Sequence, residues 1–254
     1  MLVLISPAKT LDYTSPLPTT NTSEPRFMAD SATLVKDLQQ LEAPDIARLM
    51  KLSDKLGELN YHRFQSWRRN PSADNNRQAI LAFKGDVYVG LQAQAFKAAD
   101  FNFAQSHLRI LSGLYGLLRP LDTIQPYRLE MGTSFGNQRG KNLYEFWGDK
   151  LTRQLQRDID QASAGAVVNL ASQEYSKAVR FGQLKVPVIS PVFKDSKNGE
   201  LKIISFFAKK ARGLMSAFII KNRLKQPKDL LAFDAEGYQY NSALSTTDQP
   251  VFIR

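Results

Sequence analysis

Short apolar runs alternate along the chain with longer segments in which apolar positions recur at helical spacing. The run at residues 2–5 is wholly apolar, those at residues 108–112 and 166–170 are mainly apolar, and all three are too short for helices, so they are predicted to be buried strands. Helical spacing predicts helices over residues 143–159 and 207–224. Because strands and helices alternate, we predict a mixed α/β (α+β) fold with a mixed sheet.

Shorter segments extend this prediction. Residues 80–83 and 86–89 are predicted as two further strands, and the turn Lys197-Asn198-Gly199 predicts a β-hairpin. The apolar run at residues 251–253 is predicted to close the edge of a sheet. No repeat, low-complexity tract or linker divides the chain, so we expect a single compact domain over residues 1–254.

Two helices joined by a short turn are predicted near residues 44–70. Their apolar spacing resembles the helix-hairpin-helix motif, in which backbone N–H groups at the start of the second helix bind a DNA phosphate. The glycines usual in that turn are absent, and Lys51-Leu52-Ser53 stands in their place. An ordinary αα-hairpin packed by leucines, with Leu56 and Leu59 facing inward, is the alternative. The candidate phosphate contacts are Lys51, Ser53 and Lys55.

Residues 110–122 carry two glycines, Gly113 and Gly116, between an apolar run and Arg119-Pro120. This order predicts a strand, a glycine turn with exposed backbone N–H groups, and a helical turn that stops at the proline. Exposed amides at such a junction suit a phosphate. A tight turn packed in the core is the alternative.

This stretch is one of six motifs in a fixed order, and the others are Ser6–Asp12, Pro126–Gly132, Tyr144–Trp147, Asn169–Val179 and Ile204–Gly213. The ordered set resembles the YaaA family, the peroxide stress resistance proteins of bacteria, over the whole chain. The resemblance implies a fold peculiar to that family and a cytosolic protein of the peroxide response. It also implies that the protein limits damage from intracellular iron and binds DNA.

The chain is basic, with 34 Lys and Arg against 24 Asp and Glu and a net charge of +10. Much of the excess lies between residues 194 and 228, where ten basic residues face two acidic ones. A basic surface favours an anionic partner, here double-stranded or branched DNA, although a solvated helix face is the alternative. Acids are scarce between residues 203 and 229, so i,i+4 ion pairs are not available there. The candidate DNA contacts on this helix are Lys209, Lys210, Arg212, Lys221 and Arg223.

Composition excludes several kinds of chemistry. The chain has no cysteine, which excludes disulfides, thiol peroxidase activity and peroxide sensing through a sulfenic acid. With two histidines in all, we expect no tightly bound transition metal and no other cofactor. No apolar run reaches the roughly 20 residues of a membrane span, and residues 2–5 are too short for a signal peptide. We therefore expect a cytoplasmic protein with no membrane contact.

Charged and polar side chains at predicted strand-to-loop junctions could line a common cleft. Acids, bases and a tyrosine in one cleft support proton transfer or phosphoryl chemistry. The alternative function is therefore an enzyme that acts on a phosphorylated or nucleic-acid substrate, and a structural ion-pair network remains a further alternative. No catalytic triad or nucleotide-binding fingerprint is present. The candidate cleft residues are Lys9, Ser112, Gly113, Arg119, Tyr127, Arg128, Glu130, Glu174 and Lys177.

Overall fold

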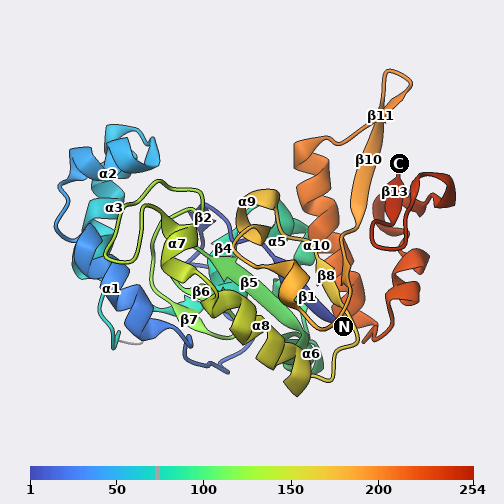
Figure 1. Cartoon of the computed structure of the whole chain (residues 1–254), viewed down its shortest axis with the longest axis horizontal. Coiled ribbons are helices and arrows are strands. Elements are labelled where there is room, and N and C mark those ends of the chain that lie inside the picture. Colours follow the sequence, from blue (N-terminus) through green and yellow to red (C-terminus); the bar gives the residue numbers. More distant parts are fainter. Residues whose placement is uncertain (72–74) are drawn as a thin grey trace.

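The computed structural model describes residues 1–71 and 75–254, and a five-stranded sheet runs through the middle of the molecule (Figure 1). Its strand order is β6-β5-β1-β8-β9, formed by β6 (Gly116–Leu118), β5 (Leu108–Ser112), β1 (Leu2–Ile5), β8 (Val167–Asn169) and β9 (Val188–Ile189). β1 pairs in parallel with β5 and β8, and β8 with β9, whereas β6 is antiparallel to β5. All four residues of β1 are buried. Both faces of the sheet are therefore covered there, which explains the continuous apolar run.

Helices provide this cover: α6 packs against β1 and β5, α8 against β6, and α9 against β5. On α8 the buried residues Leu151, Leu155 and Ile159 recur every four positions, as expected for one apolar helix face. The helices of this region are α4 (Ala79–Ala82), α5 (Asp86–Leu91), α6 (Ala98–His107), α7 (Leu143–Trp147), α8 (Lys150–Gln161) and α9 (Gln173–Ser176).

A second sheet lies at one end of the molecule, with α10 (Ser205–Lys221) between it and the central sheet (Figure 1). Its core is aromatic: the ring centroids of Phe193 and Phe252 are 5.6 Å apart, and those of Phe193 and Phe233 are 5.9 Å apart. In order, its strands are β11 (Glu200–Lys202), β10 (Val192–Lys197), β13 (Val251–Ile253) and β12 (Gln239–Tyr240). Three short 3-10 helices lie near it in the chain, namely η4 (Pro227–Ala232), η5 (Ala235–Gly237) and η6 (Ser242–Leu244).

The opposite end is helical and consists of α1 (Met28–Leu38), α2 (Ala43–Met50) and α3 (Asp54–Ser66) (Figure 1). Leu34, Ile46 and Phe64 are completely buried and join the one hydrophobic core that extends from Met1 to Phe252. The indole N–H of Trp67, just after α3, donates to the hydroxyl of Tyr115 over 2.9 Å. This buried hydrogen bond ties the helical end to the β5–β6 turn.

Short strand pairs and 3-10 turns complete the fold. They are β2 (Thr10–Leu11) with β4 (Phe83–Lys84), β3 (Arg77–Gln78) with β7 (Thr123–Ile124), η2 (Ala93–Ala95) and η3 (Phe181–Gln183). The mixed α/β fold predicted from the sequence is confirmed, as are the three predicted core strands, the hairpin at residues 197–199 and the long helix that begins near residue 207.

Four local predictions are wrong. Residues 79–82 and 86–91 form helices α4 and α5, not strands, because runs this short and apolar have no periodicity that separates the two structures. The predicted helix over residues 143–159 is interrupted at Gly148, whose φ of 48° ends α7 before α8 begins. β13 lies inside its sheet between β10 and β12, not at the edge.

The fourth correction concerns the glycine motif. β5 and β6 form an antiparallel hairpin, and no helical turn follows the glycines. Gly116 has a φ of 71°, which favours glycine, and the Tyr115 N–H donates to the Ser112 hydroxyl over 2.9 Å. Residues 112–118 are all buried. The motif is therefore a tight turn in the core, and its amides are not exposed to a phosphate.

Candidate functional site

A cleft opens where β1 and β8 end. Ser6 follows β1, and Ser172 follows β8. Because the two strands are parallel neighbours, their carboxyl ends lie together, and this edge of an open α/β sheet commonly binds ligands. The Ser172 N–H donates to the Ser6 hydroxyl oxygen over 2.8 Å, and the two hydroxyl oxygens are 3.2 Å apart.

The cleft has a volume of about 430 Å³, and α10 contributes two basic residues to its wall. Its other walls come from the segment after β1, from β4 and the start of α5, and from the loop and helix after β8. The charged residues that line it are Lys9, Lys84, Asp86, Glu130, Glu174, Lys209 and Arg212.

The acids of the cleft are already engaged. Lys9 Nζ lies 2.6 Å from Glu130 Oε1, and Arg128 contacts the same carboxylate at 3.3 Å. Glu174 Oε1 accepts the Gly132 N–H over 2.9 Å. Asp86 and Lys209 are 4.0 Å apart, the limit of an ion pair. Glu130 and Glu174 are thus held in the wall, whereas Asp86 forms no close ion pair.

Two buried tyrosines, Tyr88 and Tyr175, also line the cleft. The Tyr88 hydroxyl donates to the Ser6 carbonyl oxygen over 3.0 Å. Burial raises the pKa of the Tyr88 and Tyr175 phenols well above 10, and nearby Tyr127 raises both further. At neutral pH these phenols are protonated, so they act as hydrogen-bond donors rather than as bases.

The structure brings some of the predicted cleft residues together. Lys9, Glu130 and Glu174 line this one cavity, although they come from distant parts of the sequence. Arg128 reaches it through its contact with Glu130.

The remaining predicted cleft residues lie elsewhere. Ser112 and Tyr127 are buried and share a hydrogen bond of 2.6 Å, and a side chain at Gly113 would overlap the Leu129 carbonyl oxygen. Arg119 pairs with Asp122 at 2.8 Å. Lys177 lines a separate cavity with Tyr144 and Arg180.

The helical hairpin ends in an exposed turn. Lys51 adopts a left-handed conformation (φ 53°) after α2, and the Leu52 N–H donates back to the Ala47 carbonyl over 2.8 Å. Ser53 occupies the N-cap position of α3, but its side chain forms no capping hydrogen bond. A side chain at Gly57 would lie 2.7 Å from the Ala47 Cβ, so the two helices are in close contact.

Two leucines of α3 are more exposed than the sequence predicts. Lys51, Ser53 and Lys55 are exposed, as a phosphate contact requires. Leu56 and Leu59, predicted to face inward, are 37% and 43% exposed. The inward positions of α3 are taken by Gly57, Asn60 and Phe64.

The basic residues of α10 do not form one stripe. Lys209 and Arg212 line the cleft, whereas Lys210 pairs with Glu236 at 2.5 Å. Beyond the other end of α10, Arg223 pairs with Asp100 at 2.7 Å, and Lys221 is exposed. None of these pairs joins residues four apart on the helix, and the acids come from other segments of the chain.

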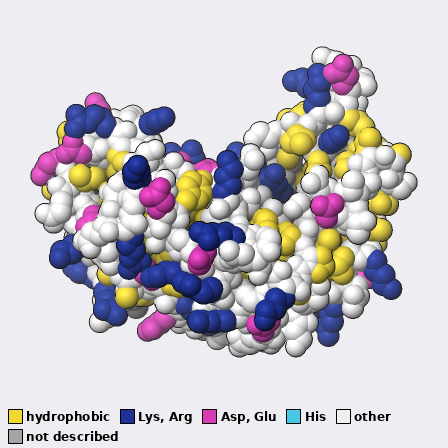
Figure 2. Space-filling view, viewed as in Figure 1, with side chains coloured by type: hydrophobic (Ala, Val, Ile, Leu, Met, Phe, Trp, Pro, Cys, Tyr) yellow, Lys and Arg dark blue, Asp and Glu magenta, His cyan; other side chains and the backbone are white. Residues whose placement is uncertain are grey.

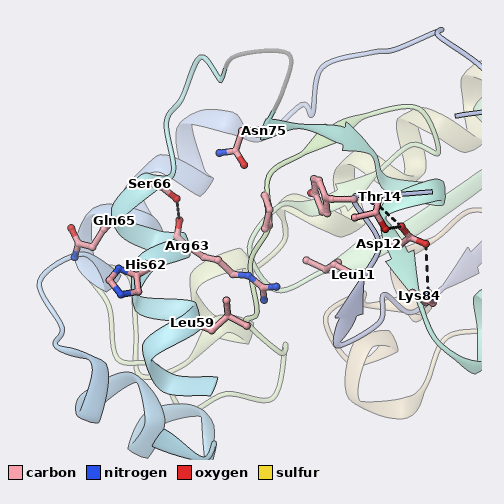
Figure 3. Close-up of a pocket in the computed structure, with 12 residues that line it drawn as sticks. Leu11, Asp12, Thr14, Leu59, His62, Arg63, Gln65, Ser66, Asn75 and Lys84 are labelled. Carbon is pink, nitrogen blue, oxygen red and sulfur yellow. Dashed lines mark hydrogen bonds and ion pairs between the residues drawn. The ribbon is translucent and has the colours of Figure 1, made fainter. Parts of the chain in front are cut away.

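A second cavity, of about 800 Å³, lies between α3 and the β2–β4 pair (Figure 3). Arg63 extends from α3 into it, and Lys84 lies on its far side. Lys84 also lines the first cleft, so the two hollows meet at this residue. Burial lowers the pKa of the Arg63 guanidinium below its usual range, and nearby Arg128 lowers it further.

Figure 2 shows Lys and Arg side chains in the hollow between the two ends of the molecule. Sequence reasoning missed both Arg63 and Lys84. Lys84, the last residue of β4, and Arg63, on α3, belong to no sequence motif, and only their position at the cavity distinguishes them.

Within the described residues, no group of three or more His, Asp or Glu side chains is arranged to hold a metal ion. None of the helices that the structure describes combines the length and apolarity needed to span a membrane.

Comparison with known proteins identifies the family. The family model described as "Peroxide stress protein YaaA" matches residues 1–244. A relative named "UPF0246 protein", from Teredinibacter turnerae (strain ATCC 39867 / T7901), is 57% identical over 254 residues, which is 100% of this chain and 99% of the relative. The resemblance seen in the sequence motifs is thus confirmed: the chain belongs to the peroxide stress protein YaaA family.

Proposed function

We propose that this member of the peroxide stress protein YaaA family binds duplex or branched DNA without sequence preference, through contacts to phosphates. The observation that carries the proposal is the exposed turn between α2 and α3. Lys51 and Lys55 flank the start of α3, both are exposed, and neither forms an ion pair with any residue that the structure describes. Two free cations beside a helix N-terminus favour an anion at that point.

The backbone adds donors at the same place. The N–H groups of Leu56 and Gly57 both donate to the Ser53 carbonyl. Those of Asp54 and Lys55 have no backbone acceptor among the described residues, as is usual for the first turn of a helix. A phosphate held by such amides is recognised through its charge and shape, so the contact carries no base sequence.

The hollow beside α3 offers further positive charge. Arg63 and Lys84 lie at the cavity next to the hairpin, and the whole chain carries a net charge of +10. A duplex that contacts the hairpin turn would therefore approach a surface that attracts its backbone.

We also propose that DNA binding is the means by which the protein limits iron-driven oxidative damage. A protein bound along the phosphates shields the sugar and base atoms beneath it. It also displaces the counterions, iron among them, that collect on the DNA backbone.

A double charge reversal tests the hairpin contact. In Lys51→Glu/Lys55→Glu, affinity for a fluorescent duplex of any sequence should fall, and the slope of log affinity against log salt should flatten by up to about two units. A matched control is Arg157→Glu/Lys185→Glu, which changes the net charge equally at two exposed residues that form no ion pair within the described chain. The control should lose much less affinity. Equal losses in the two variants would show that only net charge matters and would remove the hairpin from the proposal.

A second candidate function is an enzyme acting on a phosphorylated or nucleic-acid substrate in the cleft. It is favoured by the carboxylates of Glu130 and Glu174, which line the same cleft as the basic residues of α10. Such a pair of acids beside an anion-binding group is an arrangement that supports proton transfer to or from a bound substrate.

A further inference from the structure

Arg212 differs from the other buried or half-buried arginines of the described chain in having no partner for its guanidinium. It is half-buried in the cleft, yet among residues 1–71 and 75–254 no acceptor forms an ion pair or hydrogen bond with its guanidinium. Every other buried or half-buried arginine in the described chain has a partner for its guanidinium. These pairs are Arg26 and Arg109 with Asp158, Arg63 with Asn60, Arg77 with the Ser15 carbonyl, Arg119 with Asp122, Arg128 with Glu130, Arg223 with Asp100, and Arg254 with Asp195.

The backbone of Arg212 is fixed by its neighbours. Ala211 and Gly213 on either side are buried, and a side chain at Gly213 would overlap the Val87 carbonyl oxygen of α5. Helix α10 therefore cannot shift to carry the guanidinium into solvent. Burial lowers the pKa of the Arg212 guanidinium, because removing a cation from water without an ion-pair partner costs free energy.

A second cation lies one helical turn away. Lys209 precedes Arg212 by three residues, so both project from the same face of α10, and both line the cleft. The nearest acid, Asp86, is 4.0 Å from Lys209, which leaves that ammonium free to contact a ligand. The Ser6 and Ser172 hydroxyls line the same cavity.

The charged residues that line the cleft limit the kinds of ligand that it can bind. Two neighbouring cations suit a dianion better than a single carboxylate, and the planar guanidinium matches phosphate geometry. Glu130 and Glu174, which line the same cleft, disfavour a run of successive phosphates, such as a DNA backbone passing through. The volume of about 430 Å³ lies in the range typical of small-molecule sites.

We propose that Arg212 and Lys209 bind a phosphate monoester, carried either by a small phosphorylated molecule or by the end of a DNA strand. This site deepens the second candidate function, because it names the group that the cleft recognises. It does not depend on DNA binding at the α2–α3 turn, which lies on other elements.

Calorimetric titration with ribose 5-phosphate tests the site, and dimethyl phosphate, a diester, is the chemical control. Ribose 5-phosphate should bind and dimethyl phosphate should not. Arg212→Gln should weaken binding at least tenfold, and Arg212→Lys, which keeps the charge but loses the planar fork, should weaken it less. Arg157→Gln, which removes an exposed arginine on α8 outside the cleft, should bind as the unmodified protein does.

Two single-stranded oligonucleotides, one with a 5′-phosphate and one with a 5′-hydroxyl, separate the two sources of the monoester. Tighter binding of the phosphorylated strand, lost in Arg212→Gln and kept in Lys51→Glu/Lys55→Glu, assigns the site to strand ends. Binding of ribose 5-phosphate without that preference assigns it to a free metabolite. No binding of either phosphate monoester, or equal binding by a folded Arg212→Gln protein, overturns the proposal and leaves duplex binding at the hairpin unaffected.

Discussion

Gly90 and Gly213 lie in direct contact where α5 crosses α10. A Cβ on Gly90 would lie 3.1 Å from the Gly213 Cα and would overlap the Lys210 carbonyl oxygen, and a Cβ on Gly213 would overlap the Val87 carbonyl oxygen. Only two glycines allow the helix backbones to approach this closely. The crossing fixes α10 against the body of the protein, and with it the positions of Lys209 and Arg212.

Replacing Gly213 with alanine should therefore destabilise the protein by about 1–3 kcal/mol or more, because backbone atoms on α5 must move to admit the methyl group. Chemical denaturation with urea measures the loss. Gly182→Ala is the control, since a Cβ there meets no atom within 4 Å. A Gly213→Ala protein as stable as the control would mean that the helices are not in contact at this point.

The Asp158 carboxylate should be essential to stability. It is 1% exposed and accepts hydrogen bonds of 2.5 Å from both Arg109 and Arg26. Asp158→Ala leaves Arg109, itself 3% exposed, without its anion, which typically costs about 3–5 kcal/mol. Asp160→Ala, two residues away and exposed, should cost little. Similar unfolding midpoints for the two variants would contradict this role.

The pH dependence of His107 follows from its surroundings. Burial lowers its pKa below 6.5, and the nearby N-terminal ammonium and Arg109 lower it further, although a hydrogen-bonding contact of 3.0 Å with the Phe103 carbonyl opposes them. Because the folded pKa lies below the unfolded one, the unfolded chain binds more protons, and stability should fall as the pH drops from about 6.5 toward the folded pKa.

An NMR titration of the His107 ring measures this directly, with its signal assigned by comparison with His62→Gln. The midpoint should lie below 6.5. A midpoint at or above that value would show that the ring is solvated.

How far the sequence predicts this structure depends on whether the deciding contact is local. The runs at residues 2–5 and 108–112 are short, and the first is wholly apolar and the second mainly so, which favours strands and is visible in the sequence. Residues 86–91 are also mainly apolar, but they form helix α5, which packs against α10 at Gly90 through a contact between distant segments. The structure after Gly113 is mispredicted for a similar reason, because β6 pairs back onto β5 instead of entering a helical turn.

In the candidate site, too, some contacts can be predicted from the sequence and others cannot. Lys9 and Glu174 follow the strands whose carboxyl ends meet, so their convergence is predictable from topology. The ion pairs of Lys210 with Glu236 and of Arg223 with Asp100 join residues far apart in sequence, and no local pattern indicates them. Only the folded structure shows that the Arg212 guanidinium has no ion-pair or hydrogen-bond partner among the described residues.

The purified protein should contain no tightly bound transition metal, since the chain has no thiolate and two histidines in all. Any carboxylate site would favour hard ions such as Mg²⁺. Metal analysis of protein purified without chelators measures this. Near-stoichiometric iron that survives dialysis would contradict the expectation and would make direct iron binding the leading hypothesis.

The most direct test of DNA binding is the affinity of the unmodified protein for a short duplex, measured by fluorescence anisotropy over a series of salt concentrations. We expect binding at low salt that does not depend on base sequence. Log affinity should fall linearly with log salt, by about 0.9 for each phosphate contacted. No binding at low salt, or an affinity that salt leaves unchanged, would contradict phosphate-directed DNA binding.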